Sequence, residues 1–523
     1  MTSLQPPTDA TTLLEQGERH FLQGDLLRAE DTFREAAKLD PEAADSWSNL
    51  GVALFHLERP EDARTAFGRA LSLEPEHDAA REGLAHVDTV DAAAPDAPPT
   101  TDLLLMPAFD DEASLAEHLG RIAWYVGPWI DDIGALRIVV APDLGTPDLL
   151  DRIATSTPDH LDPAVPDLVR ALAQRTELIV DHDASALDHA FSTSSRILVW
   201  DSARWHRLTT TLRAAGATRQ LPPTIDIDPF AGTARMHEIP RVVSTVFSRE
   251  ASAAGPARFR NALETLADHK PTDICYVFGG GPTIRSAVDR DLSDGFSIVC
   301  NRFVWDDALT DHVDPTFLAF MDASCVGPSR AGTMFREHLR TWLEGGACRF
   351  VLTFDVFGPW VEFMLPPELH DRVIAAPAQA VDFPATRFNA DLRSAWWMPD
   401  AHNVITSVCL PVAATVAQEI RLLGLDGVRP DKVYESWGRS WEKDAESEAE
   451  SVPDDPFLAA LRRTHPWRHN WVSPDYQDTY RDNLEESLRR IFTQLEQAGT
   501  RITCVTPSWM EVMRDRGGAS TPA

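Results

Sequence analysis

The first 90 residues repeat themselves at a spacing of 34, and this constrains the fold more than any other feature of the chain. Small residues recur at matching positions, aromatic residues recur between them, and a proline ends each copy. The matching pairs are Gly17 and Gly51, Phe21 and Phe55, Ala29 and Ala63, Phe33 and Phe67, Ala36 and Ala70, and Pro41 and Pro75. Small residues let two helices approach closely, and the large side chains fill the space between them. The repeat therefore predicts a stack of helical hairpins.

This pattern resembles the tetratricopeptide repeat in its length and in the residue type at each position. The resemblance implies helical hairpins over 10–88, capped by a further first helix with the sequence "EHDAAREGLAHV". Two repeats and a cap leave two roles open: docking of a partner or acceptor, or a packing and dimerisation module. The segment 89–101 is rich in Ala, Pro and Asp, which predicts a semi-extended linker.

Beyond the linker, short apolar runs alternate with helical stretches, which indicates parallel α/β layers. We expect an α/β domain of unknown role over 102–245, a connecting helix over 246–270, and a Rossmann-like nucleotide-binding domain over 271–515. The predicted fold class is therefore multidomain α/β with N-terminal all-α hairpins. The strands expected in the last domain are Ile274–Phe278, Phe296–Cys300, Thr316–Phe320, Arg349–Thr353, Val373–Ala376, Glu419–Leu425 and Ile502–Val505.

The charge excludes one large class of function. The chain has 81 acidic and 48 basic residues, a net charge of −33, so its composition does not support a basic surface that coats nucleic acid. None of the six cysteines forms a CxxC pair, which favours free thiols in a reducing compartment. No apolar run approaches 18 residues and the N-terminus has no signal-like pattern, so we expect a cytoplasmic protein without a transmembrane segment.

A glycine-rich loop follows the first strand of the last domain. Gly279, Gly280, Gly281, Pro282 and Thr283 stand between an apolar run and a polar, helix-like stretch. Open α/β sheets bind ligands at the carboxyl ends of their strands, where glycine lets backbone N–H groups approach a phosphate. A tight strand-to-helix turn also favours glycine, so the loop alone leaves both interpretations open.

The order of motifs in this domain resembles that of bacterial CMP-sialic-acid-dependent sialyltransferases, Maf-type (motility-associated factor) flagellin glycosyltransferases and the broader MptE-like family. Gly279, Gly281 and Pro282 match the family's GNGPS loop, with Thr283 in place of its serine. The resemblance implies that this loop and the residues at later strand ends bind the nucleotide. Those later residues are Asn301, Ser407, Asp426 and Tyr434. The chain departs from the family pattern at three further positions: Gly280 and Asp322 each replace an asparagine, and Val428 replaces the nearer of two tyrosines.

The same resemblance implies a histidine base before the final helix. "RRTHPWRHNW" contains His465 and His469, and we favour His469 because it lies closer to that helix. A neutral imidazole has the basicity needed to deprotonate an acceptor hydroxyl near neutral pH. Packing of both histidines among neighbouring tryptophans is the alternative. Hydroxyls and tyrosines rather than a metal would hold the leaving phosphate, so no metal site is predicted.

The leading hypothesis is an inverting glycosyltransferase that uses a nucleotide-activated sugar, CMP-linked and of the nonulosonic-acid type, as a substrate, without a further cofactor. Its acceptor would be a hydroxyl of a glycan or protein, docked by the repeats. The alternative of another enzyme class is an MptE-like pterin diphosphokinase that uses ATP and Mg²⁺, with Asp322 and Asp426 at the metal. A non-catalytic scaffold that keeps the fold is the third hypothesis.

Overall fold

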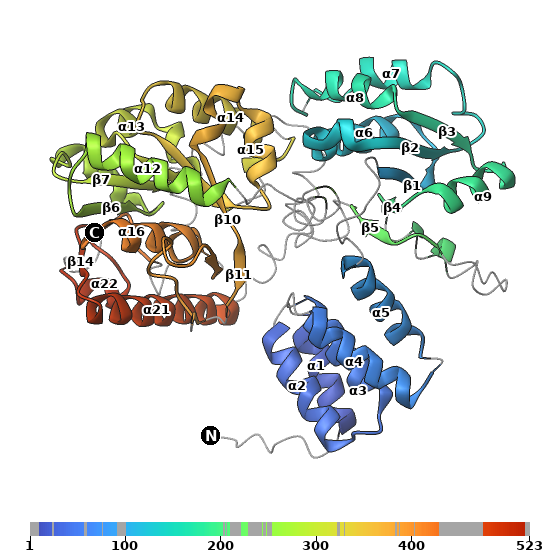
Figure 1. Ribbon diagram of the computed structural model, residues 1–523, viewed down its shortest axis with the longest axis horizontal. Coiled ribbons are helices and arrows are strands. Elements are labelled where there is room, and N and C mark those ends of the chain that lie inside the picture. Colours follow the sequence, from blue (N-terminus) through green and yellow to red (C-terminus); the bar gives the residue numbers. More distant parts are fainter. Residues whose placement is uncertain are drawn as a thin grey trace. The chain divides into compact units, whose positions relative to one another are not determined.

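The computed structural model divides the chain into two compact units, Met1–Pro99 and Thr100–Ala523 (Figure 1). The structure describes residues 10–517, except 23–25, 57–59, 76, 92–100, 160, 202–203, 206, 210–220, 228–242, 244–246, 248–253, 322–324, 329, 382–383, 386, 402 and 428–473. Each unit is taken by itself below. Among the described residues, no helix combines the length and apolar character needed to span a bilayer.

The first unit consists of helices that pack against their neighbours in the chain. Their bounds are α1 Ala10–Leu22, α2 Leu26–Leu39, α3 Ala44–His56, α4 Pro60–Leu73 and α5 Asp78–Asp91. The predicted helical hairpins are therefore present, with α5 packed on α3 and α4 as the expected cap. This cap continues to Asp91, three residues beyond the expected boundary at 88.

The structure explains the repeated small and aromatic residues. A Cβ atom on Gly51 would lie 2.7 Å from the ring of Phe67, and one on Gly83 would lie 2.3 Å from the same ring. Phe67 is 1 % exposed, so the two glycines of successive first helices enclose its ring. A Cβ on Gly17 would meet Phe33 at 2.5 Å in the preceding repeat. The glycines are thus required by the closeness of the helices.

This packing predicts opposite effects for two glycine-to-alanine changes in neighbouring helices. Gly51→Ala places a methyl group against an enclosed ring and is expected to cost about 1–3 kcal/mol of local stability. Gly68→Ala, in α4, meets nothing within 4 Å and should stabilise its helix by about 0.5–1 kcal/mol. Hydrogen exchange of peptides from α3 and α4 in the full chain measures both effects. Equal protection in the two variants would contradict the packing argument.

The second unit begins with a parallel sheet of strand order β3-β2-β1-β4-β5. Its strands are β1 Thr101–Phe109, β2 Ile133–Val140, β3 Thr176–Val180, β4 Arg196–Val199 and β5 Thr224–Asp226. The helices between them include α6 Glu112–Val126, α8 Val165–Ala173 and α9 Ala184–Thr193. β1 starts at Thr101, so α5 and β1 take both ends of the segment expected to be a linker over 89–101.

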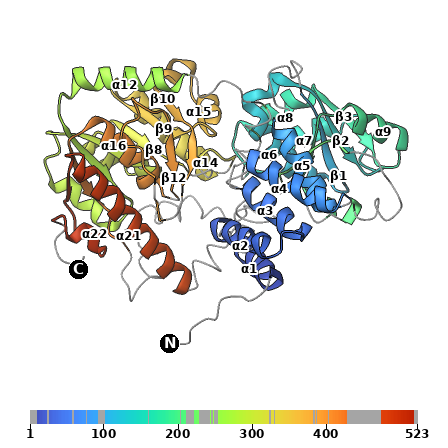
Figure 2. The same cartoon turned by 60° about the horizontal axis from the view of Figure 1, so that its bottom comes forward.

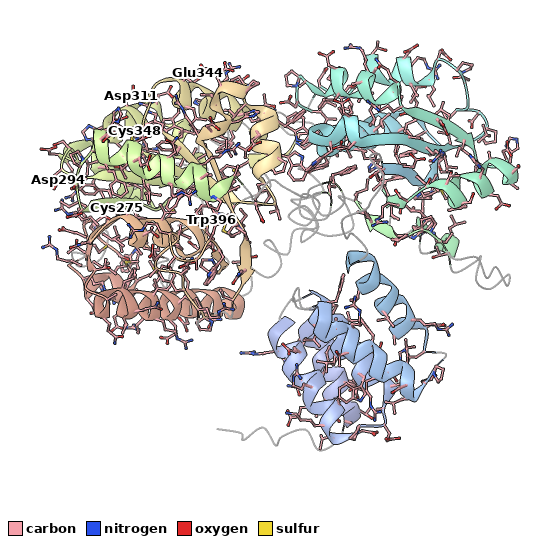
Figure 3. The ribbon with its side chains drawn as sticks, in the orientation of Figure 1. Cys275, Asp294, Asp311, Glu344, Cys348 and Trp396 are labelled. Atoms are coloured by element: carbon pink, nitrogen blue, oxygen red, sulfur yellow. The ribbon has the colours of Figure 1, made fainter. Side chains whose placement is uncertain are left out.

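Helix α12, Gly255–His269, lies within the expected connecting helix 246–270 and leads into the second sheet. Its apolar face includes Phe259, which packs against Trp396 at a ring-centroid distance of 5.4 Å (Figure 3). The two sheets fall in one compact unit, although the sequence suggested two separate α/β domains.

The second sheet is also parallel, with the order β10-β9-β8-β7-β6-β13-β14. Its strands are β6 Ile274–Phe278, β7 Phe296–Cys300, β8 Phe317–Ala319, β9 Phe350–Phe354, β10 Val373–Ala376, β13 Glu419–Leu423 and β14 Arg501–Cys504. All seven predicted strands are present; β6, β7 and β10 have the predicted bounds, and the ends of the other four differ by one or two residues. A separate two-stranded sheet pairs β11 Ala378–Ala380 with β12 Met398–Asp400.

Helices complete this α/β layer. They include α13 Asp307–Val313, α14 Arg330–Glu344, α15 Gly358–Met364, α16 Leu410–Val416, α21 Pro474–Gln497 and α22 Glu511–Arg514. Figure 2 shows the long helix α21 beside α22, and α21 also contacts β14. All six cysteines are free, and all but Cys348 are buried; Cys275, in β6, is marked in Figure 3.

Candidate functional site

The strand order of the second sheet reverses at one point, and this point is where a ligand site is expected. β6 to β10 follow one another outward from β6, and the chain then returns to add β13 and β14 on the other side of β6. The order therefore reverses between β6 and β13. In open parallel sheets, ligands bind at the carboxyl ends of the strands at this reversal. The glycine-rich loop follows β6 there, and Gly424 to Asp426 follow β13.

The two loops are joined through their backbones. The N–H of Gly279 donates to the carbonyl of Leu423 at 2.8 Å, and the N–H of Gly281 donates to the carbonyl of Gly424 at 2.8 Å. A Cβ on Gly279 or on Gly281 would lie 2.6 Å from the Gly424 carbonyl oxygen. Glycine is thus required at both positions by close contact between the loops.

These hydrogen bonds reduce the number of glycine amides that could bind a phosphate. Two of the three amides that were expected to approach a phosphate already donate to the neighbouring loop. The N–H of Gly280 has no hydrogen-bond partner within the described ranges, and Gly280 is half-buried. Any ligand contact through a backbone N–H of these glycines therefore falls to Gly280.

The side chain of Asp426, from the loop after β13, binds the start of the segment that follows the glycine loop. This segment, η2 Pro282–Asp289, is a 3-10 helix rather than the expected regular helix. The N–H of Thr283 donates to the Asp426 carboxylate at 2.9 Å, and the Thr283 hydroxyl donates to it as well. Burial raises the pKa of the Asp426 carboxyl, and the hydrogen bonds from Thr283 oppose that rise. While this link holds, an incoming phosphate cannot use the first amide of η2.

Asn301 is the most unusual residue at this edge of the sheet. It follows β7, the neighbour of β6, and begins the short helix η3 Asn301–Trp305. Its φ is +52°, in the left-handed region that asparagine tolerates better than most residues. Its Oδ1 atom is buried and has no hydrogen-bond partner among the described residues. A buried carboxamide oxygen without a partner is costly, so this atom is a candidate for ligand contact.

The structure places Ser407 in the interior. It lies in the π-helix η6 Ile405–Cys409, is fully buried, and its Oγ accepts a hydrogen bond from the N–H of Ala401 at 3.0 Å. Thr406 beside it bonds the carbonyls of Ala401 and Asn403. The hydroxyl of Ser407 therefore supports the turn before α16, Leu410–Val416. Irregular turns of this kind are frequent at functional sites.

Four of the predicted site residues lie outside the described residues: Asp322, Tyr434, His465 and His469. Pro282 is described by its backbone alone, as the first residue of η2. Within the described part of the chain, no group of three or more His, Cys, Asp or Glu side chains is arranged to hold a metal ion. The structure joins the glycine loop and Thr283 to Gly424 and Asp426, and it places Asn301 at the end of β7, the strand beside β6.

The first sheet has its own reversal, between β1 and β4, and buried rings lie there. Phe109 ends β1 and Trp200 follows β4, and their rings stack at a centroid distance of 4.1 Å. His118 of α6 lies 4.7 Å from Trp200 and is 7 % exposed. The pKa of His118 is lowered to about 4, chiefly by burial and to a lesser extent by the positive charge of Arg121 nearby. No sequence pattern marks this buried histidine, because its burial depends on packing across the sheet.

One comparison with known proteins supports the repeats. A model of the tetratricopeptide repeat family matches residues 14–75. No curated protein matches the chain. Among solved structures, a mutant of the O-GlcNAc transferase from Thermobaculum terrenum is similar, with 15 % sequence identity. The likeness covers 94 % of this chain and 92 % of the transferase, at a TM-score of 0.20, and carries no functional assignment.

Proposed function

We propose that this chain is a glycosyltransferase that uses a nucleotide-activated sugar, CMP-linked, as its donor. It transfers the sugar with inversion to a hydroxyl of a glycan or protein. The proposal rests on the order of motifs that resembles the sialyltransferase and Maf-type enzymes. It is supported by the bonds that join the glycine loop and Thr283 to the loop after β13 at the reversal of strand order, and by the place of Asn301 at the end of the neighbouring strand β7.

Asn301 is the observation that carries this proposal. Its left-handed backbone directs a carboxamide from the carboxyl end of β7 without pairing its buried oxygen to any described residue. A carboxamide both donates and accepts hydrogen bonds, so it suits the amine and carbonyl groups of a nucleotide base or the hydroxyls of a ribose. Strands are about 4.8 Å apart, so Asn301 and the glycine loop lie within the span of one nucleotide.

The chemistry of transfer is assigned by resemblance. His469, with His465 as the alternative, would accept the proton of the acceptor hydroxyl as the sugar is transferred. Tyr434 would donate to the leaving phosphate in place of a metal ion. The repeats of the first unit suit docking of a protein partner or acceptor, because repeat hairpins of this type expose extended surfaces for binding.

Replacement of Asn301 with glycine tests the site. Glycine keeps the left-handed backbone at no steric cost and removes only the carboxamide. We expect Asn301→Gly to weaken CMP binding at least tenfold, equivalent to about 1.4 kcal/mol, with little change in the melting temperature. Isothermal titration calorimetry with CMP, UDP, GDP and ATP, each with and without Mg²⁺, measures the effect.

Asp314→Gly is the matched control. Asp314 is the other described non-glycine residue with positive φ, at +43°, and it ends α13, where it pairs with Arg349. This variant should keep CMP affinity even though it loses the ion pairs of Asp314 with Arg349 and Lys270. Unchanged CMP affinity in Asn301→Gly would remove the residue from the site. Binding of ATP that requires Mg²⁺, with no binding of CMP, would favour the diphosphokinase alternative.

A further inference from the structure

A buried segment after β8 is held by residues of the first sheet's layer. The segment Cys325–Pro328 belongs to the connection between β8 and α14, and all four of its residues are buried. The indole Nε1–H of Trp124, in α6, donates to the carbonyl of Val326 at 2.8 Å. The N–H of Asp162 donates to the carbonyl of Pro328 at 3.0 Å. Both donors come from the part of the unit that contains β1 to β5.

Charged groups strengthen the same contact. Arg336 of α14 is 8 % exposed and pairs with the carboxylate of Asp162, which is 5 % exposed. The guanidinium lies 4.3 Å from the ring centroid of Trp124, and it also donates to the carbonyl of Gly327 at 3.3 Å. Three consecutive carbonyls, of residues 326 to 328, thus have fixed partners. Buried carbonyls need such partners, so the segment has little freedom to shift while they hold.

The place of this segment gives the contacts a consequence for the site. The segment follows a strand of a parallel sheet and precedes a helix, so it belongs to the carboxyl edge where Asn301 and the glycine loop lie. β7 is the only strand between β8 and β6. At about 4.8 Å per strand, β8 lies roughly 10 Å from β6, within reach of a bound nucleotide.

We propose that the layer of the first sheet supports one side of the nucleotide site by holding the buried segment Cys325–Pro328, with Trp124 and Asp162 as the positioning residues. The inference rests on the function proposed above. The inference gives the first α/β layer a supporting role. The strand ends of its own sheet suggest no such role, because the buried rings of Phe109 and Trp200 lie there.

A pair of tryptophan variants separates positioning from general stability. Trp124→Phe removes the N–H that bonds Val326 and keeps an aromatic ring beneath Arg336. Trp129→Phe is the matched control, since Trp129 packs edge-on against Trp360 of α15 at a ring-centroid distance of 5.0 Å. The full chain is titrated with CMP by calorimetry, its melting temperature is recorded, and hydrogen exchange is followed in peptides that cover 325–328.

We expect Trp124→Phe to raise the Kd for CMP about tenfold and to increase exchange in 325–328. Trp129→Phe should leave both values as in the wild-type chain, even if its melting temperature falls as far. Increased exchange in 325–328 with an unchanged Kd would overturn the inference, and so would equal effects of both variants. A wild-type chain that binds no nucleotide would instead defeat the proposed function. The exchange of 325–328 would then still decide whether Trp124 holds the segment.

Discussion

Gly424→Ala is expected to destabilise the second unit by about 3 kcal/mol. Gly424 has φ +66°, and a Cβ there would lie 2.7 Å from the carbonyl oxygen of Gly279 and 3.0 Å from Cβ of Ile284. The left-handed backbone costs an alanine about 1–2 kcal/mol. The overlap adds about 1–3 kcal/mol, because the first contact is with backbone and Ile284 is fully buried. Urea unfolding of the full chain measures the loss.

Gly499→Ala separates the two costs. Gly499 has φ +97°, and a Cβ there would meet nothing within 4 Å. This variant should therefore lose only the part of the stability that comes from forcing an alanine into a backbone with positive φ. We also expect Gly424→Ala to weaken CMP binding, since it forces apart the loops after β6 and β13, whereas Gly499→Ala leaves binding intact. Equal losses of stability in the two variants would show that the loops are not in close contact.

Acidification is expected to destabilise the second unit through His118. The pKa of His118 falls from 6.5 to about 4 in the folded chain, because burial disfavours the charged imidazole. Between these values the unfolded chain binds more protons than the folded chain, so stability rises with pH across this window and is lost as the pH falls. The contribution amounts to about 2 kcal/mol between pH 7 and pH 5, and about 3 kcal/mol by pH 4.

His118→Gln tests this assignment, because glutamine does not titrate. The experiment compares how the free energy of unfolding changes with pH in the two proteins, rather than their stabilities at pH 7. Urea unfolding of the wild-type chain and the variant at pH 7, 6 and 5 should give a shallower fall for the variant, by about 2 kcal/mol at pH 5. Parallel curves would mean that His118 does not carry this dependence.

Local pattern was enough to predict the repeat helices and the strands of the second sheet. The recurrence of Gly17, Phe33, Gly51 and Phe67 predicted the helical hairpins, because helix spacing in such a repeat is set by residue size at fixed positions. Apolar runs bounded by polar residues predicted all seven strands of the second sheet, because a strand buried on both faces is apolar along its whole length. The ends of these elements differ by a few residues, since the termini depend on caps and neighbouring loops.

The sequence predicted which candidate residues follow strands, but it did not predict their hydrogen bonds. Gly279, Thr283, Asn301 and Asp426 all follow strands, and the carboxyl ends of parallel strands share one edge. Which backbone amides remain available to a ligand depends on bonds between residues far apart in the chain. Thr283 and Asp426, for example, are 143 residues apart. The same is true of Trp124 and Val326, which are 202 residues apart. No local pattern encodes these pairs.

The sequence by itself determined the repeats, the strands, the parallel layers and the loops that end them, because each follows from residue size, polarity and backbone preference over a few neighbouring positions. Only the tertiary structure decided that Gly279 and Gly281 use their amides between loops, that Ser407 is buried, that Asn301 has a left-handed backbone and that Trp124 holds the segment after β8. These facts arise from strand order and from packing between distant segments, where partners are chosen by space and desolvation rather than by nearness in the chain.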